Sequence, residues 1–519
     1  MSWKRAAVIV ALFTFWSSEI VLAQDVTLTS RDGAIEISGD LLGFDGEFYR
    51  VDTIYGELTV DGSGVLCDGP GCPNLQDFVA ELAISGSSAM GQVLMPALIE
   101  AFARREGYTI ERKTIDEAHF VYVLSDGTSG NPVGRFTFRI SNTDEGFADL
   151  LANEADIVMA LREIRPDERQ RANEAGMGDM TRVNRSRVLA LDAMVPVVAP
   201  GNPVRKISTP DLARAFAGQI TNWAELGGPD APISLHLPAA GSGLSQAVED
   251  KLMRPVRLQV ADVAVRHALS GSVANAVAAD PFALGIASFA ETGSSQVLTL
   301  TGDCGFSLSA TRRSIKTEDF PLTSPMFLYL PVRRLPKLAR DFLVYTRGPS
   351  AQMVVRRVGF VDQTPEEIPT NSQGERFVNA ISITDEDNGV EQLRRMVDAL
   401  SPMVRLTTSF RFEAGSVRLD AQSRSNVEQM AAALESGQYD TRRILFVGFS
   451  DGDGPSAANL AIAKRRAVAV QQAVIAAAET ADLDRVSLGV DAFGEAMPMA
   501  CDDSDWGRQV NRRVEIWVR

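Results

Sequence analysis

The spacing of apolar and polar positions divides the chain into stretches of different character. Between residues 25 and 66, short apolar runs alternate with turns rich in glycine and aspartate, such as Arg31-Asp32-Gly33 and Asp61-Gly62. Runs of this length and spacing predict a small antiparallel β element. The strands expected in it cover residues 26–28, 34–37, 48–51 and 57–60. The pattern assigns no function to this element.

From residue 78 to about residue 360, strands and helices alternate, which predicts an α/β domain of two lobes. Two places in this region share one pattern, a strand that runs through a Gly/Ser turn into a helix. The first turn is Gly86-Ser87-Ser88, between a strand at 83–85 and a helix at 89–105. The second is Ala240-Gly241-Ser242-Gly243, between a strand at 233–237 and a helix at 244–252.

Each of these turns places backbone N–H groups and serine hydroxyls at a helix N-terminus, where the helix dipole favours an anion. Two such termini facing each other across a cleft would form an anion site. Either turn by itself is also what an ordinary capped helix looks like, so both interpretations stay open.

The region from residue 362 to residue 405 combines a stretch rich in Pro, Glu, Asn and Gln with one helical run at 390–400. This composition predicts a linker with a short helix between two folded domains.

Near the C-terminus, a buried strand at 443–447 leads through the Gly/Asp-rich loop 448–454 into a helix. Asn459 and Arg466 share one face of that helix, about two turns apart, so both side chains can point back at the loop that carries Asp451. A carboxylate and a guanidinium held around one spot suit a zwitterionic ligand with an ammonium and a carboxylate group.

The first 23 residues have the character of a secretory signal. Lys4 and Arg5 precede an apolar core, and Val21-Leu22-Ala23 resembles a cleavage site, so the mature chain is expected to begin at Gln24. No later stretch approaches the ~20 apolar residues that span a bilayer, and no cysteine follows the cleavage point to carry a lipid. We expect a soluble exported protein.

Length and charge narrow the class of protein further. The 519 residues suggest three or four domains, since a domain takes about 150 residues. The 51 Lys and Arg residues against 67 Asp and Glu give a net charge of −16. Because phosphate backbones require a basic surface, nucleic acid is not an expected partner.

The four cysteines of an exported protein are expected to be oxidised. Cys67 and Cys72 are close enough in sequence to staple a turn, which leaves Cys304 and Cys501 as a long-range pair between two domains. The three histidines are scattered singly, so no zinc site, metal or cofactor is expected.

One alternative is an enzyme, because Gly448-Phe449-Ser450-Asp451-Gly452 matches the nucleophile-elbow pattern of hydrolases. In that fold the catalytic histidine follows the serine, whereas every histidine here precedes Ser450. Seven residues also separate the turn from its helix, and no phosphate-binding loop or dinucleotide fingerprint offers another chemistry. We therefore expect no enzymatic activity.

The last hundred or so residues carry a linked set of motifs. They are Thr408-Ser409-Phe410-Arg411-Phe412-Glu413-Ala414-Gly415-Ser416, the 448–454 loop, Asn459 through Arg466-Ala467, and Asn511-Arg512-Arg513-Val514-Glu515-Ile516. This set resembles the OmpA-like peptidoglycan-binding domain. The resemblance implies that Asp451 and Arg466 clamp the diaminopimelate of the cell-wall peptide, with Asn459 beside them. Ser450 and Ala463 replace the usual Thr and Ser without removing a charge.

The α/β region carries a second set of motifs, Ile84-Ser85-Gly86-Ser87-Ser88, Ala155-Asp156-Ile157-Val158-Met159, Phe216-Ala217-Gly218-Gln219-Ile220-Thr221-Asn222-Trp223 and Phe320-Pro321-Leu322-Thr323. It resembles the phosphate-binding proteins of ABC transporters, which have the type 2 periplasmic-binding fold. Pro238, Leu161 and Leu244 stand where that family has anion-binding side chains. The anion-binding residues that the resemblance leaves are Ser87, Ser88, Arg162, Gly241, Ser242 and Gly243, with Arg162 expected between the two turns.

The sequence thus predicts an α/β multidomain protein with a signal peptide (1–23), a small β element (24–75), a periplasmic-binding-like domain (76–361), a linker (362–405) and an OmpA-like domain of α+β type (406–519). We expect a periplasmic protein of a Gram-negative bacterium, attached to peptidoglycan near the outer membrane, that binds a small oxyanion such as phosphate. Outer-membrane or transporter components are further candidate partners.

The alternative is a structural spacer or interaction protein between peptidoglycan and outer membrane whose binding fold has lost its ligand. Pro238, Leu161 and Leu244 favour this alternative, whereas the two Gly/Ser turns and Arg162 favour binding.

Overall fold

A computed structural model describes residues 25–75, 78–182, 184–268, 270–382, 389–412 and 416–519. The expected signal peptide, 1–23, lies outside the described residues. The chain forms two compact units, residues 1–78 and 79–519, and each is described by itself. None of the described helices is long and apolar enough to span a bilayer.

The first unit is a five-stranded antiparallel sheet of order β4-β3-β2-β1-β5. Its strands are β1 (Val26–Ser30), β2 (Glu36–Phe44), β3 (Phe48–Thr53), β4 (Gly56–Asp61) and β5 (Val65–Asp68). The predicted β element is therefore confirmed, with β5 as an additional strand. Val26, Leu28, Tyr49 and Val51 form its small core. A disulfide joins Cys67 to Cys72, as expected.

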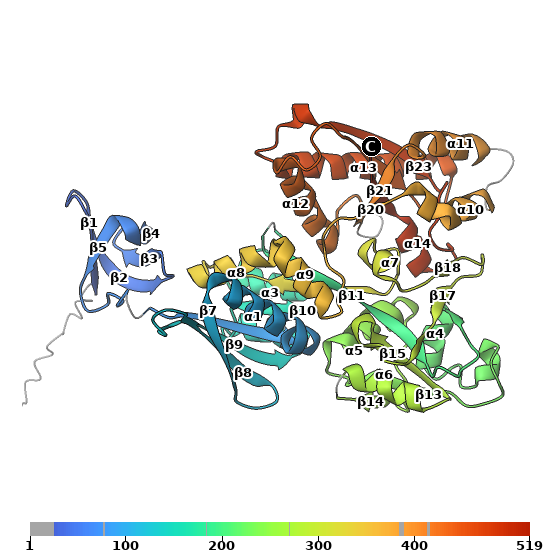
Figure 1. The fold of residues 1–519 in the computed structure, drawn as a ribbon, viewed down its shortest axis with the longest axis horizontal. Coiled ribbons are helices and arrows are strands. Elements are labelled where there is room, and N and C mark those ends of the chain that lie inside the picture. Colours follow the sequence, from blue (N-terminus) through green and yellow to red (C-terminus); the bar gives the residue numbers. More distant parts are fainter. Residues whose placement is uncertain (1–24, 76–77, 183, 269, 383–388, 413–415) are drawn as a thin grey trace, which may run out of the picture. The chain divides into compact units, whose positions relative to one another are not determined.

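The second unit begins with the two-lobed α/β domain, whose lobes share one mixed sheet of order β14-β13-β15-β11-β19-β10-β6-β9-β8-β7 (Figure 1). Lobe 1 holds β6 (Ala80–Ser87), β7 (Tyr108–Thr114), β8 (His119–Asp126), β9 (Pro132–Ser141) and β10 (Ile157–Ala160), with α1 (Met95–Glu106), α2 (Thr143–Leu151), α3 (Pro166–Glu174), α8 (Lys337–Arg347) and α9 (Pro349–Arg357). Lobe 2 holds β13 (Ser234–Pro238), β14 (Val265–His267) and β15 (Ala283–Ser288), with α4 (Thr209–Phe216), α5 (Gly243–Val248) and α6 (Ser270–Ala279).

Two strands connect the lobes. β11 (Ser186–Val198) pairs with β19 (Thr323–Tyr329) over its first part and with β15 over its last five residues, so it passes from one lobe into the other. β10, β15 and β19 are buried along their whole length. Continuous apolar burial of this kind is typical of strands covered on both faces by helices.

A third sheet, of order β20-β21-β24-β22-β23, forms the C-terminal domain. Its strands are β20 (Glu367–Ile368), β21 (Val404–Arg411), β22 (Arg443–Phe449), β23 (Ser487–Gly494) and β24 (Arg513–Val518). Ile444 and Phe446 share a core with α12 (Ala421–Glu435) and α13 (Ser456–Ala477). The alternate residues Leu445 and Val447 belong to a separate core on the other face.

That other core corrects the predicted linker, because residues 362–405 are part of the C-terminal domain. They form β20, α10 (Gly374–Ser382) and α11 (Gly389–Leu400), and β20 pairs with β21. Ala380, Met396 and Leu400 are buried with Phe449 and Trp517. The predicted helix at 390–400 is present as α11, whereas the polar composition of the region concealed α10, and the apolar residues of both helices recur every three or four positions.

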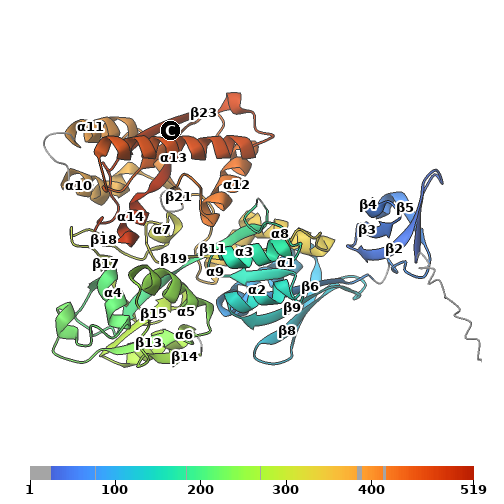
Figure 2. The same ribbon diagram turned by 180° about the vertical axis from the view of Figure 1, so that it is seen from behind.

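The C-terminal domain lies beside both lobes in the two views of the fold (Figure 1 and Figure 2). The expected disulfide between Cys304 and Cys501 is confirmed, with a Cα–Cα distance of 5.6 Å, and it links lobe 2 to the segment before α14 (Asp505–Asn511).

Candidate functional site

The two Gly/Ser turns of the sequence meet between the lobes. β6 ends at Ser87, and the helical run after it opens with a wide turn (Met90–Leu94) that continues as α1. Ser242 caps α5 by accepting a hydrogen bond from the Ser245 amide, and α5 continues as a second wide turn (Glu249–Met253). A Cβ placed on Gly243 would lie 3.1 Å from Ser87 Oγ, so the turns are in close approach and glycine is what permits it.

A third helix N-terminus joins them, which sequence reasoning did not find. Asn142 caps α2 by accepting from the Glu145 amide, and its Oδ1 also accepts from Gln246 Nε2 at 3.2 Å. The Gly241 Cβ position is 3.9 Å from Asn142 Nδ2. Asn142 follows directly after β9, so its place at a strand-to-helix junction was the signal that could have identified it.

Ser87 is the most informative residue of this group. It is fully buried, and its hydroxyl has no hydrogen-bond partner within the described part of the chain. A buried hydroxyl without a partner costs free energy, and such groups in native proteins usually have a water, ion or ligand partner.

A cavity of about 310 Å³ opens between the lobes next to Ser88 and Ser242, and Ser87 is not among the residues that line it. Its polar lining consists of the hydroxyls of Ser88, Ser242 and Ser272, the amides of Gln92 and Asn275, and the carboxylate of Glu291. Among its described lining residues there is no lysine or arginine. The cavity therefore offers neutral hydrogen-bond donors and one negative charge.

Arg162, which was expected between the two turns, is not among the residues that line this cavity. Its guanidinium is 6% exposed and donates to both carboxylate oxygens of Glu168, at 2.7 and 2.8 Å, and to Asp144. Although burial lowers the pKa of Arg162, these two carboxylates raise it above its usual range. A buried charge must be paired, and here carboxylates of the chain itself pair it.

The second candidate site, at the C-terminal domain, gathers around Asp451. Its carboxylate accepts a hydrogen bond from Arg512 Nη1 at 2.6 Å, and both side chains keep some exposure, 14% and 22% respectively. Asn459 on α13 donates a hydrogen bond from Nδ2 to Glu495 Oε2 at 2.9 Å. The same nitrogen donates to Gly454 O, in the 448–454 loop, at 3.4 Å.

Arg466, also on α13, is only 3% exposed, and its guanidinium lies 5.1 Å from the centre of the Phe412 ring. Within the described residues its one hydrogen bond runs from Nε to Ser416 O at 3.3 Å. Burial first, and then the neighbouring Arg512, lower the pKa of Arg466 to about 10, although Asp451 acts in the opposite direction. Among the described residues, Arg466 is thus a buried cation with little compensating charge.

Sequence reasoning missed Arg512 as a member of this site, although it lies in the recognised C-terminal motif. Neighbouring residues at the start of a strand point to opposite faces. Arg513 points inward and donates to the buried Glu515 at 2.7 Å, so Arg512 was the one left to reach the loop. Asp502, which accepts from the Gly452 amide at 2.7 Å, also escaped notice because it lies 50 residues from the loop that it holds.

Comparisons with known proteins bear on both sites. The family model of the PBP superfamily domain matches residues 71–354, which is more than half of the chain, and the OmpA family model matches residues 411–512. Both models describe families of binding proteins rather than enzymes.

Among curated proteins, protein SphX of Synechococcus elongatus is 24% identical over 43% of this chain and 68% of its own length. The phosphate-binding protein PstS of Bacillus subtilis is 26% identical over 36% of this chain and 61% of its own length.

Among solved structures, an ABC-type phosphate transport receptor from Vibrio cholerae aligns with 54% of this chain and 99% of its own, at 20% identity and a TM-score of 0.41. The peptidoglycan-associated lipoprotein of Burkholderia pseudomallei aligns with 21% of this chain and 89% of its own, at 27% identity and a TM-score of 0.19.

Proposed function

The chain belongs to the PBP superfamily and carries a domain of the OmpA family, and from this premise we propose that it is a binding protein of the periplasm held on peptidoglycan. In this proposal the C-terminal domain grips the diaminopimelate of the wall peptide. The cleft between the lobes receives a small polar ligand, an oxyanion such as phosphate. The signal-like N-terminus and two disulfides fit an exported protein.

The observation that supports the attachment to peptidoglycan is the burial of Arg466, which is 3% exposed and makes one hydrogen bond, at 3.3 Å, among the described residues. Its lowered pKa means that the folded protein holds this cation at a cost that a ligand carboxylate would relieve. Asp451, paired with Arg512 but still partly exposed, can accept the ligand ammonium. The carboxylate of diaminopimelate would thus pair with Arg466, and its ammonium group would pair with Asp451.

Co-sedimentation with purified peptidoglycan tests this attachment. Asp451→Ala and Arg466→Ala should each lose about 2–5 kcal/mol of binding free energy, because each leaves a ligand charge unpaired. Asp453→Ala and Arg465→Ala are matched controls, since both residues are exposed neighbours on the same loop and helix. Wild-type sedimentation of the two site variants, or equal loss in the controls, would contradict the assignment.

The cleft is proposed as an oxyanion site because three helix N-termini meet there, close to Ser87 Oγ, which is buried and has no hydrogen-bond partner in the described part of the chain. Serine hydroxyls and backbone amides would supply the donors. Since Arg162 is committed to Glu168 and Asp144, no charged donor adds its usual ~1.5–3 kcal/mol, and the affinity should be modest.

The alternative, a spacer that binds no small ligand, is favoured by the same pairing of Arg162 and by Glu291. A carboxylate in the cavity repels an anion unless one of the two is protonated.

Calorimetry with phosphate, sulfate and acetate separates these two functions. If the cleft binds an oxyanion, Ser87→Ala should weaken binding and Glu291→Gln should strengthen it by about 1 kcal/mol or more, because a repulsive charge is removed. If none of the three anions gives a heat of binding with either the wild type or Glu291→Gln, the cleft does not bind an oxyanion, and the protein is a spacer that binds no small ligand.

A further inference from the structure

The C-terminal domain contacts lobe 1 through α12. Glu428 pairs with Arg347 at the end of α8, at 2.5 Å, and accepts a hydrogen bond from the Asn184 amide at 3.3 Å. The Ala421 amide, at the start of α12, donates to Glu163 Oε1 at 2.8 Å. These contacts reach the lobe on which β6 and Ser87 lie.

The same domain contacts lobe 2 through the segment 501–506. Cys501 is bonded to Cys304, and Asp503 Oδ2 accepts from the Asp303 amide at 2.5 Å. Trp506 donates to the Lys251 carbonyl at 2.6 Å and packs into the hydrophobic core that the two lobes share. One covalent bond and one buried aromatic ring therefore hold the lobe that carries Ser242.

Between these contacts lies Asp319, just before the shared strand β19. It accepts hydrogen bonds from Arg405 and Arg411 of β21, each at 2.9 Å, and all three side chains are buried. Although burial raises the pKa of Asp319, the two arginines hold it well below its usual range. Asp319 of the two-lobed domain thus supplies the countercharge for Arg405 and Arg411 of the C-terminal domain. Separating the two domains would leave these buried charges uncompensated.

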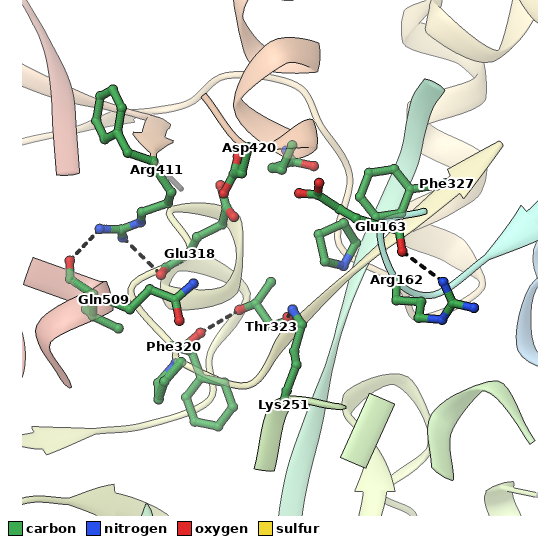
Figure 3. A pocket seen from close by; sticks show the side chains of 15 residues that line it. Arg162, Glu163, Lys251, Glu318, Phe320, Thr323, Phe327, Arg411, Asp420 and Gln509 are labelled. Atoms are coloured by element: carbon green, nitrogen blue, oxygen red, sulfur yellow. Dashed lines mark hydrogen bonds between the residues drawn. The ribbon is translucent and has the colours of Figure 1, made fainter. Parts of the chain in front are cut away.

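Figure 3 shows where lobe and C-terminal residues meet. Arg411, Asp420 and Gln509 of the C-terminal domain line a cavity of about 350 Å³ together with Glu163 of lobe 1 and Lys251 of lobe 2. Residues of the C-terminal domain and of both lobes therefore also meet around this one cavity, in addition to the contacts described above.

A further ion pair joins the lobes directly. Arg165, which precedes α3 in lobe 1, donates to Asp250 in lobe 2 at 3.1 Å, and Arg162 Nε lies 3.7 Å from the same carboxylate. Asp250 is half-buried and follows α5, the helix capped by Ser242.

We propose that the C-terminal domain is a brace that bridges both lobes and, together with the Asp250 ion pair, holds the cleft at one width whether or not a ligand is present. Two-lobed binding proteins ordinarily close around a ligand by a hinge motion. Here an opening of the lobes would strain the Cys304–Cys501 connection, the Asp319 pairs and the Trp506 contact together. This inference concerns the lobes alone and does not rest on the proposed ligand.

Pulsed dipolar spectroscopy of the full chain tests the brace. Spin labels on non-canonical residues at Ser129 in lobe 1 and Ala224 in lobe 2, both exposed, report the distance between the lobes without touching a cysteine. The wild type should give one narrow distance distribution that inorganic phosphate does not shift. Combining Cys304→Ser and Cys501→Ser with Asp250→Asn, Asp319→Asn and Trp506→Ala should add a second population at longer distance.

The double variant Cys67→Ser/Cys72→Ser is the matched control and should leave the distribution unchanged, since its disulfide lies in the other unit. A broad wild-type distribution, or a shift on adding phosphate, would overturn the brace. So would a combined variant that folds and keeps the wild-type distribution. If phosphate does not bind, the wild type should still give one narrow distance distribution, so this part of the test does not depend on the proposed ligand.

Discussion

Two buried arginines show how the partners of a residue decide its role. Arg162 is enclosed by Glu168, Asp144 and Asp250, and its pKa is raised. Arg466 has another arginine beside it, and its pKa is lowered to about 10. The first is a structural ion pair and the second is suited to receive a ligand anion. The sequence could not make this distinction for Arg162, because Asp144 and Asp250 lie far from it along the chain.

Glu318 leads to a prediction about pH. Its backbone has a φ of 55°, a left-handed conformation that is unusual outside glycine, and its side chain lines the cavity in Figure 3. Burial and the nearby Asp420 raise its pKa to about 8. A raised pKa means that the folded state favours the protonated acid. The contribution of Glu318 to the free energy of unfolding is therefore fully present below pH 4.5, the pKa of the group in the unfolded chain. It is lost as the pH rises through the folded-state pKa of about 8.

Thermal unfolding from pH 5 to pH 9 checks this, with Glu318→Gln as the matched variant that stays neutral throughout. The wild type should lose stability relative to the variant across this range, by a few kcal/mol at most, since about 1.4 kcal/mol accompanies each pKa unit. Other acids titrate in both proteins, so only the difference between the two curves is informative. Parallel curves would show that Glu318 ionises normally.

At the scale of elements, hydrophobic periodicity predicted most of the framework. Four strands of the first unit, the helices that follow the two Gly/Ser turns, and the strand–loop–helix around Asp451 overlap the positions that the pattern predicted, whereas β5 was missed and β2 is longer than predicted. In the region 362–405 the predicted helix at 390–400 is confirmed, but the linker is wrong, because the turn-rich start of the region gives no sign of α10 or of the core that both helices join. The burial of Met396 and Leu400 depends on Trp517, a residue more than a hundred positions away.

The candidate sites were less predictable than the framework. Ser87, Ser88 and Ser242 could be chosen because turn chemistry is local, and Asp451, Asn459 and Arg466 because helical spacing is local. Asn142, Glu291 and Arg512 come to the sites from other strands and loops, so only the fold brings them together.

At the scale of the whole molecule, the long-range disulfide was the one contact between domains that the sequence indicated. Cys304 and Cys501 are 197 residues apart, and pairing by elimination placed them together correctly. No local sequence pattern predicted that Arg405 and Arg411 of the C-terminal domain would pair with Asp319, or that this domain would contact both lobes. A wall-binding domain fixed in this way would position the cleft relative to the peptidoglycan, not merely tether it.

In the proposed function, a ligand carboxylate completes the charge balance at Arg466. Calorimetry of the full chain with two soluble wall peptides, identical except that diaminopimelate in one is replaced by lysine in the other, tests it most directly. Lysine keeps the ammonium for Asp451 and lacks the carboxylate for Arg466. We expect binding of the diaminopimelate peptide and a loss of about 2–5 kcal/mol with the lysine peptide. Equal affinity for the two peptides, or no binding of either, would contradict the binding of a diaminopimelate carboxylate by Arg466.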